Sequence, residues 1–135
     1  MPRLLVIDDS LSKRIATEFK RRGRNALSVS ELGLKGEKDP PLLAHLHDRD
    51  PDCVLITGDD AMPATHAGDL QRFGTTVAVI VPWDSSSGLR EPEWERDIAH
   101  RWVHLMEEQE RASVFRYSRQ GRRKWVWRKR PPPTV

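Results

Sequence analysis

Residues 4–10 read Leu-Leu-Val-Ile-Asp-Asp-Ser, a continuous apolar run that ends abruptly in two carboxylates. Such a run, with no polar residue at alternate positions, is typical of a strand buried on both faces of a parallel sheet. Two further runs share this character, Val-Leu-Ile-Thr at residues 54–57 and Thr-Val-Ala-Val-Ile-Val at residues 76–81. Together with a shorter apolar run at residues 26–29, they predict four strands.

Amphipathic segments separate these runs. Leu11, Ile15 and Phe19 recur every four residues before Gly23, which predicts a first helix. A second helix is expected to begin at Asp39-Pro40, a short third helix to cover residues 65–73, and a long fourth helix to cover residues 92–112. Alternating strands and helices predict an α/β fold with right-handed crossovers and a mostly parallel sheet of four or five strands.

Charge divides the chain into two unequal parts. Residues 1–110 carry 14 Lys and Arg against 20 Asp and Glu, a net charge of −6, whereas residues 111–135 carry nine basic residues and no acid. Within the basic part, alternating apolar and polar residues at 114–118 and 124–127 predict an appended β-hairpin. We therefore expect an α/β domain over residues 1–112 and a basic, aromatic-containing extension over residues 113–135.

The sequence favours a cytoplasmic protein that does not enter a membrane. No apolar run approaches the roughly 20 residues that a spanning helix needs, and the first apolar run is interrupted too early for an export signal. Cys53 is the single cysteine and lies in an apolar run, so no disulfide within the chain is possible.

Acidic residues follow two of the predicted strands. Asp8 and Asp9 end the first, Asp59 and Asp60 come just after the third, and Asp39 begins a helix that must start near the same edge of the sheet. Carboxylates so gathered repel one another unless a hard cation such as Mg²⁺ binds them. A cation at such a site can activate water and steady a transferring phosphoryl group, so the arrangement favours phosphodiester hydrolysis.

Structural roles explain some of these carboxylates equally well. Asp39 before a proline is a good helix N-cap, and Asp59 or Asp60 can open a turn. His100 and His104, with Asp97 one turn earlier, have a spacing that could hold zinc or could simply face solvent or a partner.

Three segments in order resemble the PIN-like proteins found among VapC-type toxin ribonucleases. Residues 5–11 resemble the family's first strand, which ends in Asp, an acidic residue and Asn-Leu. Residues 28–39 resemble its second strand, glycine-containing loop and acidic helix start. Residues 54–59 resemble its third strand running into Thr-x-Asp. The resemblance covers somewhat under half of the chain.

This resemblance implies a fold, an activity and a partner. The fold would be a PIN-like three-layer α/β/α sandwich, and the activity Mg²⁺- or Mn²⁺-dependent endoribonuclease hydrolysis by the toxin of a toxin–antitoxin system. Asp8, Asp39 and Asp59 would be the catalytic, metal-binding acids, with Asp60 as a further metal ligand. A cognate antitoxin would block the site in a hetero-oligomer, and a homodimer is the other expected assembly.

Departures from the family pattern support a second hypothesis. The family usually has a further Asp two residues after the position of Asp59, followed by an aromatic, where this chain has Ala61 and Met62. The position of the family's Asn is Ser10. A catalytically inactive PIN-like module that binds RNA or protein is therefore an alternative function.

A receiver-like signalling domain is a third hypothesis. Residues 6–10 resemble its acidic metal-binding start, and residues 51–56 followed by Met62-Pro63 resemble its phosphorylation strand. The phosphate-accepting Asp is replaced by Thr57, and the expected Lys-Pro pair after a fifth strand is missing.

Basic and aromatic side chains alternate in the C-terminal extension, a pattern that suits single-stranded RNA because guanidinium groups bind phosphates and aromatic rings stack on unpaired bases. Alternatively, the tryptophans pack on the body or a partner, or the extension covers the acidic edge of a neighbouring subunit. The candidate RNA-binding residues are Arg116, Arg119, Arg122, Arg123, Lys124, Trp125, Trp127 and Arg128.

Overall fold

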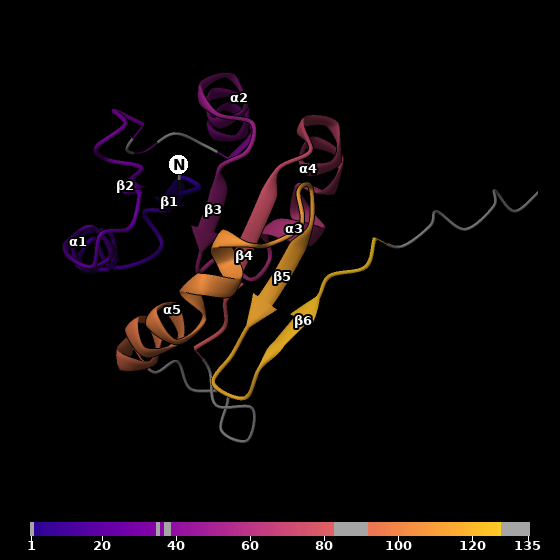
Figure 1. The fold of residues 1–135 in the computed structure, drawn as a ribbon. Coiled ribbons are helices and arrows are strands. Elements are labelled where there is room, and N and C mark those ends of the chain that lie inside the picture. Colours follow the sequence, from indigo (N-terminus) through magenta and orange to yellow (C-terminus); the bar gives the residue numbers. More distant parts are fainter. Residues whose placement is uncertain (1, 35, 37–38, 83–91, 128–135) are drawn as a thin grey trace, which may run out of the picture.

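The computed structural model describes residues 2–34, 36, 39–82 and 92–127, and they form a six-stranded sheet with helices on both faces (Figure 1). The sheet has the order β2-β1-β3-β4-β5-β6, in which the first five strands in the chain are parallel and β6 is antiparallel to β5. The strands are β1 (Leu5–Ile7), β2 (Ala26–Ser28), β3 (Val54–Thr57), β4 (Thr76–Ile80), β5 (Val114–Tyr117) and β6 (Arg122–Lys124).

Two helices cover one face of the sheet and three cover the other. They are α1 (Arg14–Arg21), α2 (Asp39–Arg49), α3 (Met62–Thr65), α4 (Ala67–Phe73) and α5 (Pro92–Glu107). The α1 and α5 helices share one buried apolar cluster with the sheet, and α2, α3 and α4 share the other. The arrangement is a three-layer α/β/α sandwich, as the alternation of strands and helices predicted.

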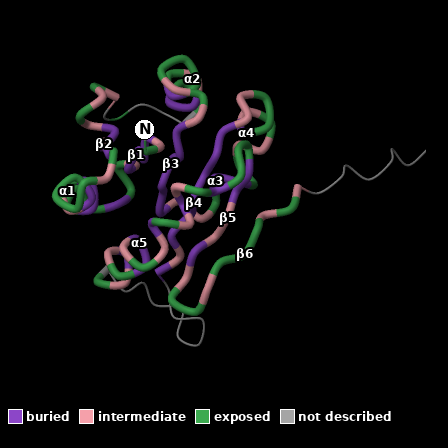
Figure 2. Tube along the Cα trace, in the orientation of Figure 1, coloured by how far each residue is buried: buried purple, intermediate pink, exposed green. Residues whose placement is uncertain are grey.

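The central strands are buried on both faces, as their continuous apolar runs predicted (Figure 2). Leu5 and Ile7 of β1 belong to the cluster under α1 and α5, whereas Val6 between them belongs to the cluster under α2. Successive side chains of a strand point to opposite faces, so only a strand covered on both sides needs every residue apolar.

The C-terminal hairpin continues the sheet and is not appended to it. Residues 114–117 form β5, which pairs in parallel with β4 after the α5 crossover, and Tyr117 is fully buried in the core. The sheet therefore has one strand more than the expected maximum of five, and the expected boundary at residues 112 and 113 falls between α5 and a strand of the same sheet. The run alternates because its two faces differ: Phe115 and Tyr117 pack in the α1–α5 cluster, whereas Arg116 on the opposite face is only partly buried.

Two helices differ from their predicted limits. The segment expected to be one helix over 65–73 is two helices that meet at His66, whose φ of −116° lies outside helical geometry. The last helix ends at Glu107 and not near residue 112: the Gln109 N–H donates to Met106 O three residues back, and Ala112 adopts a left-handed conformation with φ 60° in the turn before β5.

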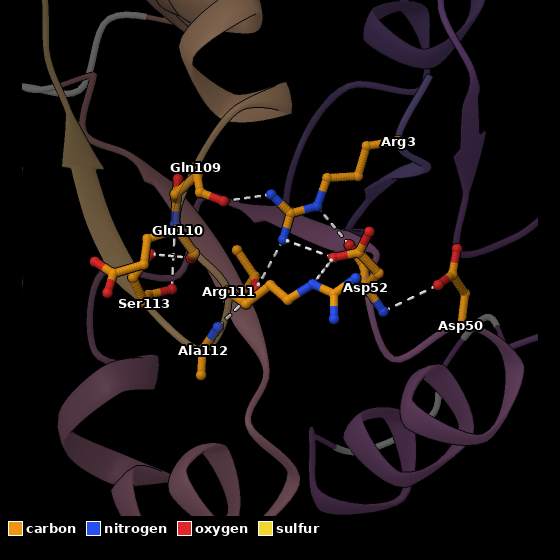
Figure 3. Close-up of polar contacts among 9 residues, drawn as sticks. Arg3, Asp50, Asp52, Gln109, Glu110, Arg111, Ala112 and Ser113 are labelled. Carbon is orange, nitrogen blue, oxygen red and sulfur yellow. Dashed lines mark hydrogen bonds and ion pairs between the residues drawn. The ribbon is translucent and has the colours of Figure 1, made fainter. Parts of the chain in front are cut away.

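Arg3 ties together the amino ends of four neighbouring strands (Figure 3). Its guanidinium donates to the carbonyl oxygens of Asp52, which precedes β3, and Gln109, which precedes β5, and to Oγ1 of Thr76, the first residue of β4. Asp52 Oδ1 lies 3.4 Å from this guanidinium. The amino edge is thus closed by a structural network, which leaves the carboxyl edge as the place for a site.

Candidate metal centre at the carboxyl edge of the sheet

The chain changes direction between β1 and β3. It leaves β1 for β2 on one side and then returns to β3 on the other, so the two crossovers separate above the carboxyl ends of β1 and β3. In doubly wound sheets this switch point is where ligands bind. Asp8 directly follows β1 and Thr57 ends β3, so the predicted acidic edge lies at this point.

The carboxylate of Asp8 is held across the two strands. Its Oδ2 accepts hydrogen bonds from Thr57 Oγ1 at 2.7 Å and from Ser10 Oγ at 2.8 Å, and its backbone N–H donates to Ile56 O at 2.9 Å. Ser10 Oγ in turn accepts from the backbone N–H of Gly58 at 2.9 Å. Two hydroxyl donors on one oxygen fix the orientation of the carboxylate.

Asp59 is positioned by the same threonine. Thr57 is completely buried, and its Oγ1 accepts from the Asp59 N–H at 3.1 Å. Oδ1 of Asp59 accepts from the Ala61 N–H at 3.0 Å, which is the turn-forming role that was one interpretation of this residue. One buried hydroxyl therefore organises both Asp8 and Asp59. The roles of Thr57 and Ser10 went unassigned in the sequence, although both lie inside the matched motifs.

The glycine-containing loop before α2 also contacts this edge. Gly33 and Gly36 adopt φ values of 74° and 79°, which glycine reaches without steric cost, and the Gly36 N–H donates to Asp9 Oδ2 at 3.3 Å. The helix α2 begins at Asp39, as expected. The side chain of Asp39 lies outside the described residues, so its expected role as a metal ligand stays a prediction.

Asp60 forms an ion pair with Arg116, a residue of β5. Its Oδ1 lies 2.8 Å from Arg116 Nη2, and its carbonyl oxygen accepts from the same nitrogen at 3.2 Å. The Arg116 guanidinium also lies over the ring of Trp125, 5.1 Å from the centroid. A metal ion on the Asp60 carboxylate would compete with Arg116, and the expected role of Asp60 as a further metal ligand stays a prediction.

Two carboxylates fit a magnesium ion that keeps most of its water. Within the described ranges, no group of three or more His, Cys, Asp or Glu side chains could hold a metal ion. Asp8 and Asp59 each use one carboxylate oxygen in the hydrogen bonds above, and their other oxygens accept none from described residues. Because Mg²⁺ commonly binds through one or two carboxylates and several waters, this edge suits it better than it suits a metal that needs a closed cage.

No protein-family model matches the chain, and neither the curated proteins nor the solved structures include a match. The likeness to PIN-like proteins therefore rests on the three sequence motifs.

The strand order by itself allows the receiver hypothesis, but the edge chemistry does not favour it. The order β2-β1-β3-β4-β5 is the doubly wound order of flavodoxin and of receiver domains. A receiver needs a carboxylate at the end of β3 to accept phosphate, and that position is the buried Thr57. After β5 the chain continues with Ser118-Arg119 where a receiver has Lys-Pro.

Several basic residues of the extension have partners within the chain. Arg119 lies 3.9 Å from Asp97 and over the ring of Trp94, and Lys124 lies 2.8 Å from Glu110. Both side chains remain partly exposed and so accessible to a further partner.

The remaining candidate RNA-binding residues of the extension fall into three groups. Trp125 and Trp127 pack against the core on the α2–α4 face, which confirms the alternative that they contact the body. Arg122 lies over the ring of Phe115, and Arg123 is exposed. Arg128 lies outside the described residues.

The two histidines of α5 do not form a metal pair. His100 is enclosed by the α1 helix, with Nε2 3.3 Å from Glu18 Oε2 and its ring edge-on to Phe19, whereas His104 is exposed. Burial lowers the pKa of His100, and neighbouring Arg22 adds to this effect. The role of His100 is structural.

Among the helices that the structure describes, none has both the length and the apolar character needed to cross a bilayer.

Proposed function

We propose that the chain is a Mg²⁺- or Mn²⁺-dependent endoribonuclease and the toxin of a toxin–antitoxin pair. One observation carries the nuclease proposal: Asp8 is fixed by Thr57 and Ser10 at the β1/β3 switch point, beside Asp59, with one oxygen of each carboxylate left for a cation. The antitoxin partner and the cytoplasmic location come from the family resemblance and from the sequence.

The proposed reaction is hydrolysis of an RNA phosphodiester. A water molecule gives up a proton as its oxygen bonds to phosphorus, the bond to the leaving ribose oxygen breaks, and that oxygen gains a proton. A bound divalent cation would supply an activated water and positive charge opposite the phosphoryl oxygens. Asp8 and Asp59, with Asp39, would hold that cation, and Thr57 and Ser10 keep the Asp8 carboxylate in one orientation.

An inactive PIN-like module is the second candidate. Ala61 stands where the family has an acid, and Asp60, the neighbouring carboxylate, is paired with Arg116. A site with fewer acids binds its cation more weakly, so this hypothesis differs from the first in metal affinity and turnover, with no difference in fold.

Cleavage of single-stranded RNA tests the proposal. Wild type, Asp8→Asn and the control Asp48→Asn, which changes an exposed aspartate on α2, are compared with Mg²⁺, with Mn²⁺ and with EDTA. We expect metal-dependent cleavage by wild type and by the control, and none by Asp8→Asn. Cleavage by Asp8→Asn at the wild-type rate would remove Asp8 from the site, and no cleavage by any protein would favour the inactive module.

A further inference from the structure

A groove lies between the tryptophans after β6 and the short helices α3 and α4. It has a volume of about 460 Å³ and is lined by Pro63, Ala64, Ala67, Gln71, Trp125 and Trp127. Small side chains form one wall and indole rings the other, and Gln71 supplies an amide. A space of this kind accepts a flat, mostly apolar ring that carries hydrogen-bonding groups on its edge.

The indole rings are held in place before any ligand arrives. The backbone N–H of Trp125 donates to the carbonyl oxygen of Val114 at 2.7 Å, which extends the β5–β6 pairing by one residue. Trp127 meets Trp125 edge-on, with 6.2 Å between ring centroids, and both rings pack against the core. A ligand that stacks here therefore spends little free energy on ordering the aromatic wall.

Arg116 connects this groove to the candidate metal centre. Its guanidinium contacts Asp60 on one side and the ring of Trp125 on the other. Asp60 follows Asp59 in the chain, so the groove and the acidic edge share a boundary at Arg116.

A second arginine lies directly across from the first. Arg123 of β6 is the register partner of Arg116 in β5, and Arg123 is exposed. Like charges opposite each other destabilise a strand pair, and Asp60 compensates only one of these two. Both arginines line a hollow of about 370 Å³, together with Arg122, Ser118 and Gln120. An anion at this place would relieve the repulsion.

We propose that this surface is a subsite for single-stranded RNA, in which one unpaired base stacks in the tryptophan groove and a neighbouring phosphate lies between Arg116 and Arg123. The inference rests on the proposed nuclease function and adds the substrate class. An aromatic groove admits a base only when that base is unpaired, so duplex RNA is disfavoured. The basic border matches a phosphodiester better than it matches the apolar face of a protein helix.

Binding is measured with Asp8→Asn protein in EDTA, so that the RNA stays intact, by fluorescence anisotropy of a labelled single-stranded oligonucleotide and of the same sequence as a duplex. In this background, Ala64→Glu places a carboxylate in the groove from an exposed position. Thr17→Glu, exposed on α1 across the sheet, adds the same charge elsewhere. Trp127→Leu removes one ring of the wall.

We expect single-stranded RNA to bind more tightly than the duplex. Ala64→Glu and Trp127→Leu should each weaken single-strand binding roughly tenfold or more, whereas Thr17→Glu should leave it nearly unchanged. Melting temperatures measured in parallel show that the variants are folded. Equal affinity for the single strand and the duplex would overturn the subsite. Unchanged single-strand affinity of folded Ala64→Glu would overturn it as well. A protein partner that binds in the groove, while RNA affinity does not depend on the groove, would do the same.

Failure of the subsite and failure of the nuclease can be separated. Groove-dependent RNA binding without metal-dependent cleavage supports the subsite and rejects the nuclease. Cleavage that is insensitive to Ala64→Glu and Trp127→Leu supports the nuclease and rejects the subsite.

Discussion

Thr57 and Asp8 are joined across neighbouring strands by a hydrogen bond of 2.7 Å, with the threonine hydroxyl as donor and carboxylate Oδ2 as acceptor. The same hydroxyl oxygen accepts from the backbone of Asp59. A fully buried group thus sets the positions of two carboxylates at the surface, and a change in the core should alter the site without touching a ligand.

Replacing Thr57 by valine tests this relationship. The side chain keeps its shape but loses the hydroxyl, so Asp8 and Asp59 lose their common partner. Outer partners of metal ligands typically contribute 10- to 100-fold to metal affinity or activity, and we expect Thr57→Val to lower Mg²⁺ affinity by about tenfold. Calorimetric titration with Mg²⁺ measures this affinity. Thr57→Ser, which keeps the hydroxyl, is the control and should bind nearly as wild type; equal affinities for the valine and serine variants would contradict the argument.

Removing the charge of Arg116 should have the opposite effect on the cation. Arg116→Gln frees the carboxylate of Asp60 and takes one positive charge away from the edge. We therefore expect Mg²⁺ affinity to rise by about two- to tenfold in the absence of RNA, because a nearby positive charge that repels the metal ion is removed. Arg119→Gln serves as the control, because that arginine pairs with Asp97 on another part of the surface. A fall in Mg²⁺ affinity in Arg116→Gln would show that Asp60 and Arg116 support the site as a unit.

Arg3 should matter for stability and not for chemistry. Its side chain is only 10% exposed and joins the starts of β1, β3, β4 and β5. Arg3→Met removes the side-chain donor to the carbonyl oxygens of Asp52 and Gln109, and we expect a loss of about 2–3 kcal/mol in the free energy of unfolding. Arg111→Met is the matched control, since Arg111 also pairs with Asp52 but is 77% exposed; its loss should stay below about 1 kcal/mol. Urea denaturation measures both, and equal losses would show that the network contributes only surface ion pairing.

Acid should weaken the contact between α1 and α5. Two hydrogen bonds from Arg96, at 2.7 and 2.8 Å, lower the pKa of Glu18 to about 2 from its ordinary value of 4.5. The unfolded chain therefore binds this proton at a higher pH than the folded chain does. The resulting stability is present above about pH 4.5 and is lost as the pH falls toward 2.

The Glu18→Gln variant isolates this effect. We expect its denaturation midpoint to lie below that of wild type at pH 7 and the two midpoints to converge near pH 2. Glu108→Gln, which changes an exposed residue just after α5, should follow wild type at every pH. A constant difference between Glu18→Gln and wild type across the whole range would mean that charge plays no part.

The sequence was sufficient to predict the centre of the fold and to place two candidate residues, Asp8 and Asp59, at the same edge of the sheet. Strands such as β3 were predicted because every residue from Val54 to Ile56 is apolar, and parallel strand ends converge, which placed Asp8 near Asp59. The pairing of Asp60 with Arg116 could not be predicted, since it joins positions 56 residues apart and depends on β5 lying beside β4. Thr57 was visible in a motif, but its role needed the register that sets Ile7 opposite Ile56.

Strand β6 has a consequence for solubility. It is three residues long, consists of Arg122, Arg123 and Lys124, which are all exposed, and forms the last strand of the sheet among the described residues. An open strand edge is a template on which another chain can add, and short, positively charged edge strands oppose such growth. The arginines that we assign to RNA would then also keep copies of this protein from aggregating strand to strand, so neutralising them to abolish RNA binding carries a risk of fibrous assembly.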